Sequence, residues 1–550
     1  MRIILCVLSG FLLFTSTVVY SQDDRENSTG VPPGAEKEKG EELTFDIWEY
    51  QVDGNSLLDR VVVERAVYNY LGPDKTIQNV EDARKNLEQL YHSKGYGTVL
   101  VDIPEQDVRE GVVRLKVTEG KVGRIRVTGS RYFSLGRIRS QVPSLQKGET
   151  PSLTELQKEL VALNQVTPDR KISPVLRPGR LPGTVEVELK VKDQLPVHGS
   201  LEVNNQQSPD TSSLRITGTL RYDNLWQKEH SLSFMYQMAP ENRDDVEVYS
   251  GTYVMRMPDS DNVLALYGVL LSSDVSTVGS VSVIGDGSIY GARYIVPFTP
   301  GKDYFHSLTV GVDYKEFNDS TELQGADSFK TPIDYLNWVA EYKGTFVSNS
   351  TFTAFNVGSH FGIRGLVNST REFAEKRGGV DRNGNPARGA AKPNYLYATG
   401  GIEHRHKLPW NMGLSVGLDG QLSKSPLISN EQYSAGGYNS VRGYHVAEAL
   451  GDDGIRGTLE LQSPSLSQYL LKEYVQSLYL LTFIDAAKLW VDDTAPGQTG
   501  SFELIGTGLG SRLTAFKTLD AALDIAWPLT SVEKVDAGDM RVHFSVKYGF

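Results

Sequence analysis

The spacing of apolar residues along this chain changes between its first part and the remainder. In residues 45–119, segments with apolar residues three or four positions apart alternate with segments in which every second residue is apolar. These spacings predict the order strand, helix, helix, strand, strand. Both spacings recur in residues 120–193, where Ser152 stands at the start of a helical segment. The clearest positions are Val80, Ala83, Leu87, Leu90 and Tyr91, then Val113, Leu115 and Val117, and, in the second stretch, Leu153, Leu156, Leu160 and Leu163. The chain is therefore predicted to contain two small α+β modules in tandem.

From about residue 194 to residue 550 the helical spacing is absent, and short segments of alternating apolar and polar residues follow one another. We count about sixteen such segments, roughly 22 residues apart, which fits membrane-crossing strands of about ten residues joined by alternating short turns and longer loops. In such a barrel the apolar side chains face membrane lipid and the others face the lumen. These residues are therefore predicted to form a transmembrane antiparallel β-barrel of about 16 strands.

The final segment shows this alternation most strongly. Its apolar face comprises Met540, Val542, Phe544, Val546, Tyr548 and Phe550. One such segment would fit a soluble β-sandwich equally well. The long series of similar segments and the aromatic residue at the end of the last one favour the membrane barrel.

The first 43 residues are predicted to lie outside these folded parts. Residues 1–21 contain an apolar run followed by small residues and a polar stretch, the layout of a cleaved secretory signal peptide. Residues 22–43 are polar and highly charged, so we expect a linker; the alternative is a short plug-like helix after Pro33, which Gly40 would interrupt. Because Cys6 is the only cysteine and lies in the signal peptide, the mature chain is expected to have no disulfide and no thiolate metal site.

Charge and motifs argue against several function classes. A net charge of −12 disfavours nucleic acid as a partner, because phosphate binding depends on clustered Lys and Arg. The sequence contains no phosphate-binding loop, no H-E-x-x-H and no nucleophile elbow between a strand and a helix, so we expect no enzyme activity, no ATP-driven transport and no cofactor.

Asp381, Asn383 and Asn385 have the spacing of a calcium loop, but Pro386 replaces the required glycine and no glutamate closes the site. No metal site is predicted there.

Two connections in the barrel part are longer than hairpin turns, at about residues 362–392 and 423–453. Loops of this length are usually functional or disordered. The first is rich in charged residues and is predicted to be a solvated surface loop. The second contains Val441-Arg442-Gly443-Tyr444 and joins strands eleven and twelve of our count.

Strand thirteen of this count carries Phe483, Asp485 and Ala487 at alternate positions, so their side chains share one face. A carboxylate is expected on the lumen side, because an ionised group that faces lipid at mid-depth is energetically unfavourable. From these residues alone, the simpler interpretation is that Arg442 is a solvated loop residue and Asp485 an ordinary lumen side chain.

The order of glycines, prolines and polar residues in the two modules is more specific than any of these residues singly. The first module contains, in order, Val52-Asp53-Gly54-Asn55, Gly95-Tyr96, Pro104, Gln106, Gly111 and Glu119-Gly120, and the second contains Leu163-Asn164, Pro168, Arg170, Pro178-Gly179 and Pro182-Gly183. This order resembles the two POTRA (polypeptide-transport-associated) domains of two-partner (type V) secretion transporters, the TpsB or ShlB/FhaC/HecB-like family. The loop and strand motifs described above are similar to those of the same family and of the wider outer-membrane assembly superfamily. Ala487 departs from the pattern, because the family usually has glycine there.

The resemblance implies domain boundaries and site residues. It assigns residues 44–119 and 120–193 to POTRA domains 1 and 2, and residues 194–550 to the barrel. It places the loop motif, Val441, Arg442, Gly443 and Tyr444, inside the lumen, with Arg442 paired to Asp485 on the strand that also carries Phe483. It also makes Phe550 the signal by which the barrel assembly machinery recognises and inserts the chain.

The resemblance further implies a transporter in the bacterial outer membrane, with its POTRA domains in the periplasm. These domains would capture an exported partner protein, expected to be a large β-helical exoprotein, and the barrel would secrete it without ATP. An exposed POTRA strand offers an edge to which an extended partner segment can add. The alternatives are a factor that inserts barrel proteins, a passive uptake channel and a secreted soluble binding protein. Two POTRA modules rather than a longer array argue against the first, and the presence of these modules argues against the second.

Overall fold

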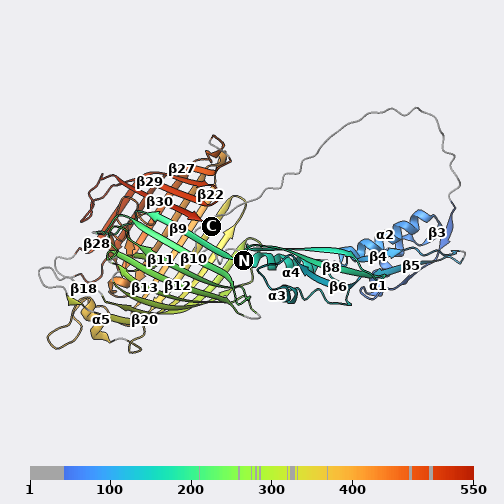
Figure 1. The fold of residues 1–550 in the computed structure, drawn as a ribbon, viewed down its shortest axis with the longest axis horizontal. Helices are drawn as coiled ribbons and strands as arrows, with labels where there is room; N and C mark the ends of the chain where they lie inside the picture. Colours follow the sequence, from blue (N-terminus) through green and yellow to red (C-terminus); the bar gives the residue numbers. More distant parts are fainter. Residues whose placement is uncertain are drawn as a thin grey trace. The chain divides into compact units, whose positions relative to one another are not determined.

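The computed structural model describes residues 43–550 apart from residues 109, 210, 258–259, 274–275, 279–280, 284–285, 319, 322–328, 331, 368, 470–472 and 495–498. The predicted signal peptide and the predicted linker up to residue 42 lie outside the described residues, so both stay predictions. The chain divides into two compact units, one that ends at Leu195 and one that comprises Pro196–Phe550 (Figure 1).

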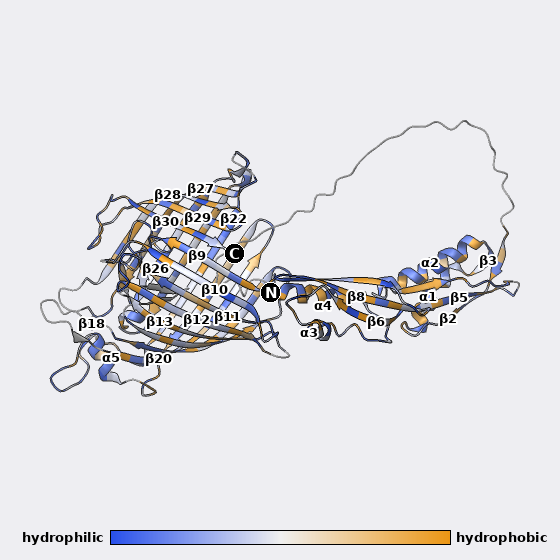
Figure 2. Cartoon of the chain, in the orientation of Figure 1, coloured by the Kyte–Doolittle hydropathy of each residue, from blue (hydrophilic) through white to orange (hydrophobic). Residues whose placement is uncertain are grey.

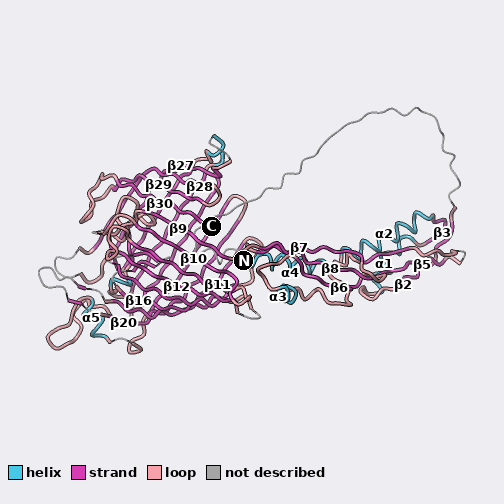
Figure 3. The backbone as a smooth tube through the Cα atoms, in the orientation of Figure 1, coloured by secondary structure: helices cyan, strands magenta, loops and turns pink. Residues whose placement is uncertain are grey.

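The first unit begins with a small mixed sheet covered by helices (Figure 3). Its elements are β1 (Phe45–Ile47), β2 (Glu49–Asp53), α1 (Arg60–Val67), η1 (Tyr68–Tyr70), β3 (Gly72–Lys75), α2 (Ile77–Ser93), β4 (Val99–Asp102) and β5 (Val112–Glu119). The central strand is β5, with β2 parallel on one side and β4 antiparallel on the other, while β1 pairs with β3. Leu87 of α2 and Leu115 of β5 are both fully buried in its core. Gly54 has φ +87° and a Cβ there would lie 2.3 Å from Val117 O, so the turn after β2 requires glycine.

The second module repeats this design with β8 as the central strand. Its elements are β6 (Lys121–Thr128), α3 (Leu135–Ser140), α4 (Leu153–Val166), β7 (Arg170–Pro178) and β8 (Thr184–Asp193). Ser152 caps α4 by accepting a hydrogen bond from the Glu155 N–H. The buried face of α4 consists of Leu156, Leu160 and Leu163, three of the residues that predicted the helix. The short helix α3 was not predicted.

Asp193, at the end of β8, closes the second module by binding the turn after β6. Its carboxylate accepts hydrogen bonds from the Tyr132 N–H at 2.8 Å, the Ser130 hydroxyl at 2.8 Å and the Arg131 N–H at 2.8 Å. Burial acts to raise the pKa of Asp193, but these hydrogen bonds together outweigh it and hold the pKa below its ordinary value. The ionised form is therefore favoured by folding.

We expect Asp193→Asn to lower the free energy of unfolding of the fragment 44–193 at pH 7. This loss of unfolding free energy should become smaller as the pH falls from the unfolded-state pKa of about 3.9 towards the lower pKa of the folded state. At such pH values the wild-type carboxylate is itself protonated and loses the same charge. Urea unfolding at pH 7 and at pH 3 measures this difference. An equal difference at both pH values would contradict the role given to the carboxylate.

Sixteen antiparallel strands close the second unit into a barrel, which confirms the predicted architecture. In chain order they are β9 (Val197–Asn204), β10 (Arg215–Leu225), β11 (His230–Met238), β12 (Val246–Arg256), β13 (Val263–Ser273), β16 (Gly287–Pro297), β17 (Tyr304–Phe317), β20 (Ile333–Val347), β21 (Thr351–Phe361), β22 (Leu396–Lys407), β23 (Gly413–Ser423), β26 (Asp453–Gln462), β27 (Val475–Trp490), β28 (Ser501–Ala515), β29 (Leu519–Pro528) and β30 (Arg541–Gly549). Each strand pairs with the next one in this order, and β30 pairs with β9.

Hydrophobic and hydrophilic residues alternate along the barrel strands (Figure 2). On β27, Phe483 and Asp485 are 3% and 0% exposed, whereas Leu480 and Ile484 are 51% and 45% exposed. The exposed apolar set faces lipid, and the buried set faces the interior. Among the helices that the structure describes, none has the length and apolar character needed to cross a membrane.

The connections between barrel strands carry short elements of their own. These are the hairpins β14 (Ser276–Val278) with β15 (Val281–Val283), β18 (Ser320–Thr321) with β19 (Phe329–Lys330) and β24 (Tyr433–Ala435) with β25 (Ala449–Gly451), the helix α5 (Thr370–Lys376), and the 3₁₀ turns η2 (Pro409–Asn411), η3 (Ser429–Glu431) and η4 (Ser467–Tyr469).

The prediction of a solvated surface loop at residues 362–392 holds for most of its charged residues and was wrong for the part around α5. Phe373 and Ala374 of α5 are fully buried, and Arg377 binds the buried carboxylate of Asp452. The loop folds back because these apolar side chains find apolar partners on the barrel strands. Most charged residues of the described loop have the expected exposed character, among them Arg371 and Glu375 of α5. At the tip the Asp381 carboxylate accepts backbone hydrogen bonds from Asn383 and Asn385, as in a simple polar turn.

Candidate functional site

The loop between β23 and β26, residues 424–452, lies inside the barrel. Glu431 near its start contacts Lys315 of β17, and Arg442 near its middle contacts Asp485 of β27. These strands are the seventh and the thirteenth of sixteen in the ring. Only the interior of a closed cylinder borders both, so the loop crosses the lumen.

Arg442 and Asp485 form a bidentate ion pair. Arg442 Nε lies 2.7 Å from Asp485 Oδ2 and Arg442 Nη2 lies 2.8 Å from Asp485 Oδ1. The backbone N–H of Arg442 also donates to Asp485 Oδ2 at 3.2 Å, and the Thr458 hydroxyl of β26 donates to Asp485 Oδ1. Arg442 is 4% exposed and Asp485 0%, so the pair is desolvated. A planar guanidinium fits this double contact, which a lysine ammonium does not.

Phe483 and two further carboxylates complete the surroundings of the guanidinium. Arg442 Cζ lies 3.5 Å from the centroid of the Phe483 ring, a cation–π contact. Arg442 Nη1 lies 2.6 Å from Glu460 Oε1 and 3.5 Å from Asp524 Oδ2. Asp524 is in turn bound by Arg512 of β28. Strands β26, β27, β28 and β29 thus all contribute to holding one loop residue.

The neighbours of Arg442 in the loop are held as well. Val441 is fully buried in an apolar cluster. Gly443 has φ +100°, and its N–H donates to His543 Nε2 of β30 at 3.0 Å. The Tyr444 hydroxyl donates to the Thr530 carbonyl oxygen at 2.7 Å. The motif therefore fixes the loop through its charge, its backbone and its aromatic side chain.

Gly506 of β28 lies directly against the backbone of Arg442. A Cβ on Gly506 would lie 1.9 Å from the Arg442 carbonyl oxygen, so only glycine fits. The methyl group of Ala487 joins the cluster around Val441.

Phe550 lies at the junction of β30 and β9. Its N–H donates to the Gly199 carbonyl oxygen and the Gly199 N–H donates to the Phe550 carbonyl oxygen, both at 3.0 Å. A Cβ on Gly199 would lie 2.3 Å from the Phe550 ring, which therefore covers the glycine. Phe550 is 66% exposed. Its role as an insertion signal stays a prediction.

Several residues of this site were missed from the sequence. Glu460, Asp524, Gly506 and His543 lie on barrel strands at lumen-facing positions, where polar and small residues are ordinary. The motif residues identified the loop, but no sequence signal distinguished these four partners from other lumen residues.

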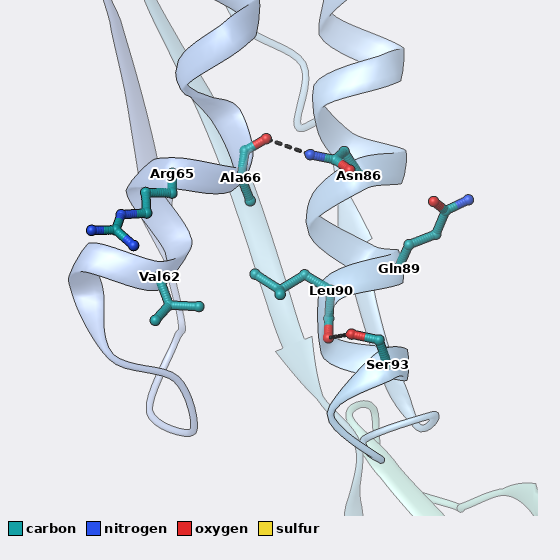
Figure 4. A pocket seen from close by; sticks show the side chains of 7 residues that line it. All are labelled: Val62, Arg65, Ala66, Asn86, Gln89, Leu90 and Ser93. Carbon is teal, nitrogen blue, oxygen red and sulfur yellow. Dashed lines mark hydrogen bonds between the residues drawn. The ribbon is translucent and has the colours of Figure 1, made fainter.

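A groove of about 480 Å³ opens between α1 and α2 of the first module (Figure 4). Asn86 donates across it to the Ala66 carbonyl oxygen at 2.6 Å, and the Ser93 hydroxyl donates to the Leu90 carbonyl oxygen at 2.7 Å. Because these polar side chains are already bonded to the helices, we assign no ligand to the groove.

Two models of protein families match the chain. Residues 45–120 match the ShlB-type POTRA domain, and residues 183–513 match the haemolysin secretion/activation protein ShlB/FhaC/HecB. The second match covers more than half of the chain. The chain belongs to the ShlB/FhaC/HecB family. It is accordingly an outer-membrane transporter with periplasmic POTRA domains, from a family of transporters and not of enzymes.

Individual relatives of this ShlB/FhaC/HecB protein are distant in sequence. The heme/hemopexin transporter protein HuxB of Haemophilus influenzae is 22% identical over 448 residues, which cover 80% of this chain and 75% of HuxB. The outer membrane transporter CdiB of Dickeya dadantii is 21% identical over 500 residues, 88% of this chain and 83% of CdiB.

Two solved structures share the fold. CdiB from Escherichia coli has a TM-score of 0.58 at 17% identity and covers 94% of this chain and 93% of that one. BamA from Haemophilus ducreyi lacking POTRA domains 1–3 has a TM-score of 0.57 at 13% identity and covers 92% of this chain and 100% of that one. At these identities the likeness concerns the fold alone.

Proposed function

We propose that this transporter captures an exported partner polypeptide with its two periplasmic modules and secretes it through its barrel without ATP. The observation that carries the proposal is a closed sixteen-strand barrel with a loop inside its lumen. Side-chain contacts hold this loop in place, and such non-covalent contacts can break and form again. In this proposal the Arg442–Asp485 pair holds residues 424–452 as a constriction.

The edge strand β7 is the acceptor that we propose for the partner. Its inner side pairs with β8 over residues 170–178. The Asn164 side chain bonds the backbone of Ile172 on β7 at 2.7 and 2.9 Å, and residues beyond it are mostly exposed. Pro174 and Pro178 have no backbone N–H, so beyond Ile172 this edge would bind a partner segment chiefly through its carbonyl oxygens and would resist indiscriminate pairing. Main-chain hydrogen bonds would align an extended partner segment with β7, and they would not require one particular partner sequence.

The partner that we propose is a large, β-helical secreted protein. Both HuxB and CdiB are named as transporters, which supports a transported cargo for this chain. Folding of the cargo outside the cell would supply direction, because a chain that folds there cannot return through the barrel as an extended segment. The likeness to BamA extends only to the fold and gives no separate support to a role in barrel insertion.

The fragment 44–193 is expected to fold alone and to bind the N-terminal region of the partner protein. Circular dichroism of the fragment checks folding, and calorimetric titration with the partner segment checks binding. An unrelated unfolded chain of equal length and charge is the control. Equal binding to that control, or loss of helical signal in the free fragment, would count against the capture role.

A further inference from the structure

We propose that residues 369–395 and 424–452 form one lid over the outer mouth of the barrel, and that Arg377 and Asp452 are the clamp that holds it closed. "Outer" here means the end where the longer connections gather, which faces the cell exterior in barrels of this kind. That the lid opens during secretion rests on the proposed function. That the two loops form a lid does not.

Part of the inner wall at the outer mouth is lined by apolar side chains, whereas a water-filled barrel is expected to be polar inside. Six of the seven consecutive strands from β12 to β22 contribute buried apolar positions at their outer ends: Val246, Val248, Val269, Leu271, Ile289, Phe317, Ile333, Tyr335 and Tyr397. The two loops add Phe373, Ala391, Tyr395, Leu427 and Ile428 to the same cluster. All of these side chains are at most 6% exposed. The mouth is therefore packed like a protein core along this part of the wall.

The helix α5 provides the central contact of this packing, at the end of β20 where Figure 1 places it. The Phe373 ring meets the Tyr335 ring edge-on, with centroids 5.6 Å apart, and the Tyr395 ring at 6.1 Å. Aromatic pairs at these separations add to the gain from apolar burial. The first loop is thus attached to the barrel wall by its apolar side chains.

Arg377, directly after α5, ties this first loop to the second. It donates to both oxygens of Asp452, with Nη2 2.7 Å from Oδ2. It also donates to the carbonyl oxygens of Leu427 at 2.6 Å and Asp492 at 2.9 Å. Asp452 is fully buried. One guanidinium therefore joins both ends of the loop 424–452 and the connection after β27.

Glu431 anchors the second loop to the wall opposite Arg442. Its Oε1 lies 2.5 Å from Lys315 Nζ and accepts the Tyr335 hydroxyl at 2.6 Å, and its Oε2 accepts the Tyr397 hydroxyl at 2.7 Å. The three partners lie on β17, β20 and β22. With Arg442 held by the far wall, this anchor stretches the loop across the mouth.

The substitution Arg377→Ala tests the clamp. Asp452 would keep three donors, the N–H groups of Leu427 and Asp492 at 2.8 Å each and Gln432 Nε2 at 3.2 Å. The matched control is Arg371→Ala, which removes an exposed arginine of the same helix whose only described ion pair is with Glu375.

The measurement is the open probability of single channels of the purified full-length protein in planar lipid bilayers. Arg377→Ala is expected to raise it on the order of tenfold, the change that corresponds to about 1.4 kcal/mol. Arg371→Ala should match the wild type. Phe373→Ser, which disrupts the apolar packing without touching the clamp, should raise it as well. If Arg377→Ala did not assemble into a barrel, Phe373→Ser would decide the question by the same criterion.

Wild-type open probability in Arg377→Ala and Phe373→Ser, with both barrels assembled, would overturn the lid. Because ion conductance requires no partner protein, the result is independent of the proposed function. A rise in open probability together with no secretion of any candidate partner would uphold the lid and count against the proposed function.

Discussion

Replacing Arg442 with alanine is expected to reduce secretion of the partner protein on the order of tenfold or more while the barrel still inserts into the outer membrane. The change leaves the fully buried carboxylate of Asp485 without its bidentate partner. Loss of one member of a desolvated ion pair costs on the order of 3–5 kcal/mol. Immunoblots of the culture medium measure secretion. Heat-modifiable gel migration measures assembly, because a closed hydrogen-bonded barrel resists detergent until it is heated.

Companion variants separate the ion pair from a general loss of charge. Arg442→Lys should not restore full secretion, since an ammonium cannot make the two parallel contacts. The double variant Arg442→Ala, Asp485→Ala should be no worse than either single change, because paired residues are not additive. Arg405→Ala, which removes an exposed arginine paired with Glu403, is the control and should secrete normally. Strictly additive defects, or normal secretion by Arg442→Ala, would refute the pairing as the functional element.

The second large effect is expected in the core of the first module. Leu87→Ala should lower the free energy of unfolding of the fragment 44–193 by about 2–5 kcal/mol, because Leu87 is fully buried and alanine leaves a cavity. Urea unfolding followed by circular dichroism gives this value. The full-length variant should then lose secretion while its barrel still assembles.

The matched control for this change is Leu100→Ala in the same module. Leu100 is 55% exposed on β4, so its removal should change the free energy of unfolding by no more than about 0.5 kcal/mol. Equal losses for the two variants would show that the core around α2 is not organised as described.

The architecture was predictable because it depends on periodicities that extend over many residues. The alternation that predicted about sixteen strands reflects a single physical division between lipid and lumen, repeated in every strand. The helix α4 was predictable for the same reason, since its leucines recur at helical spacing from Leu153 onward. The placement of the loop 424–452 between strands eleven and twelve followed directly from the strand count.

The lid could not be predicted, because its contacts join residues far apart in the chain. Arg377 stands among charged residues, and its partner Asp452 is 75 positions away. Phe373 and Ala374 are too few to give a helical pattern. Glu431 looks like any loop glutamate until the fold places it beside Lys315, 116 positions earlier.

Among the partners of Arg442, some could be predicted from the sequence and others could not. The motif and Asp485 were identified as a pair because a family pattern names them, and the structure brings the two into contact. Glu460, Asp524 and Gly506 had no such pattern, and their proximity arises only from the register between β26, β27, β28 and β29.

The junction between β9 and β30 determines the order in which the barrel forms. Ser545 and Glu202, which bond across it, are 343 positions apart, and the two strands share only five residue pairs, Ser545 to Gly549 with Asn204 to Ser200. Contacts of such large sequence separation form late, because the entropy of closing the intervening chain opposes them. Until then the sheet has two unpaired edges, which invite association with other chains. The sheet would therefore be open and prone to aggregation before closure, and the final joining of β30 to β9 would be the slow step of barrel formation.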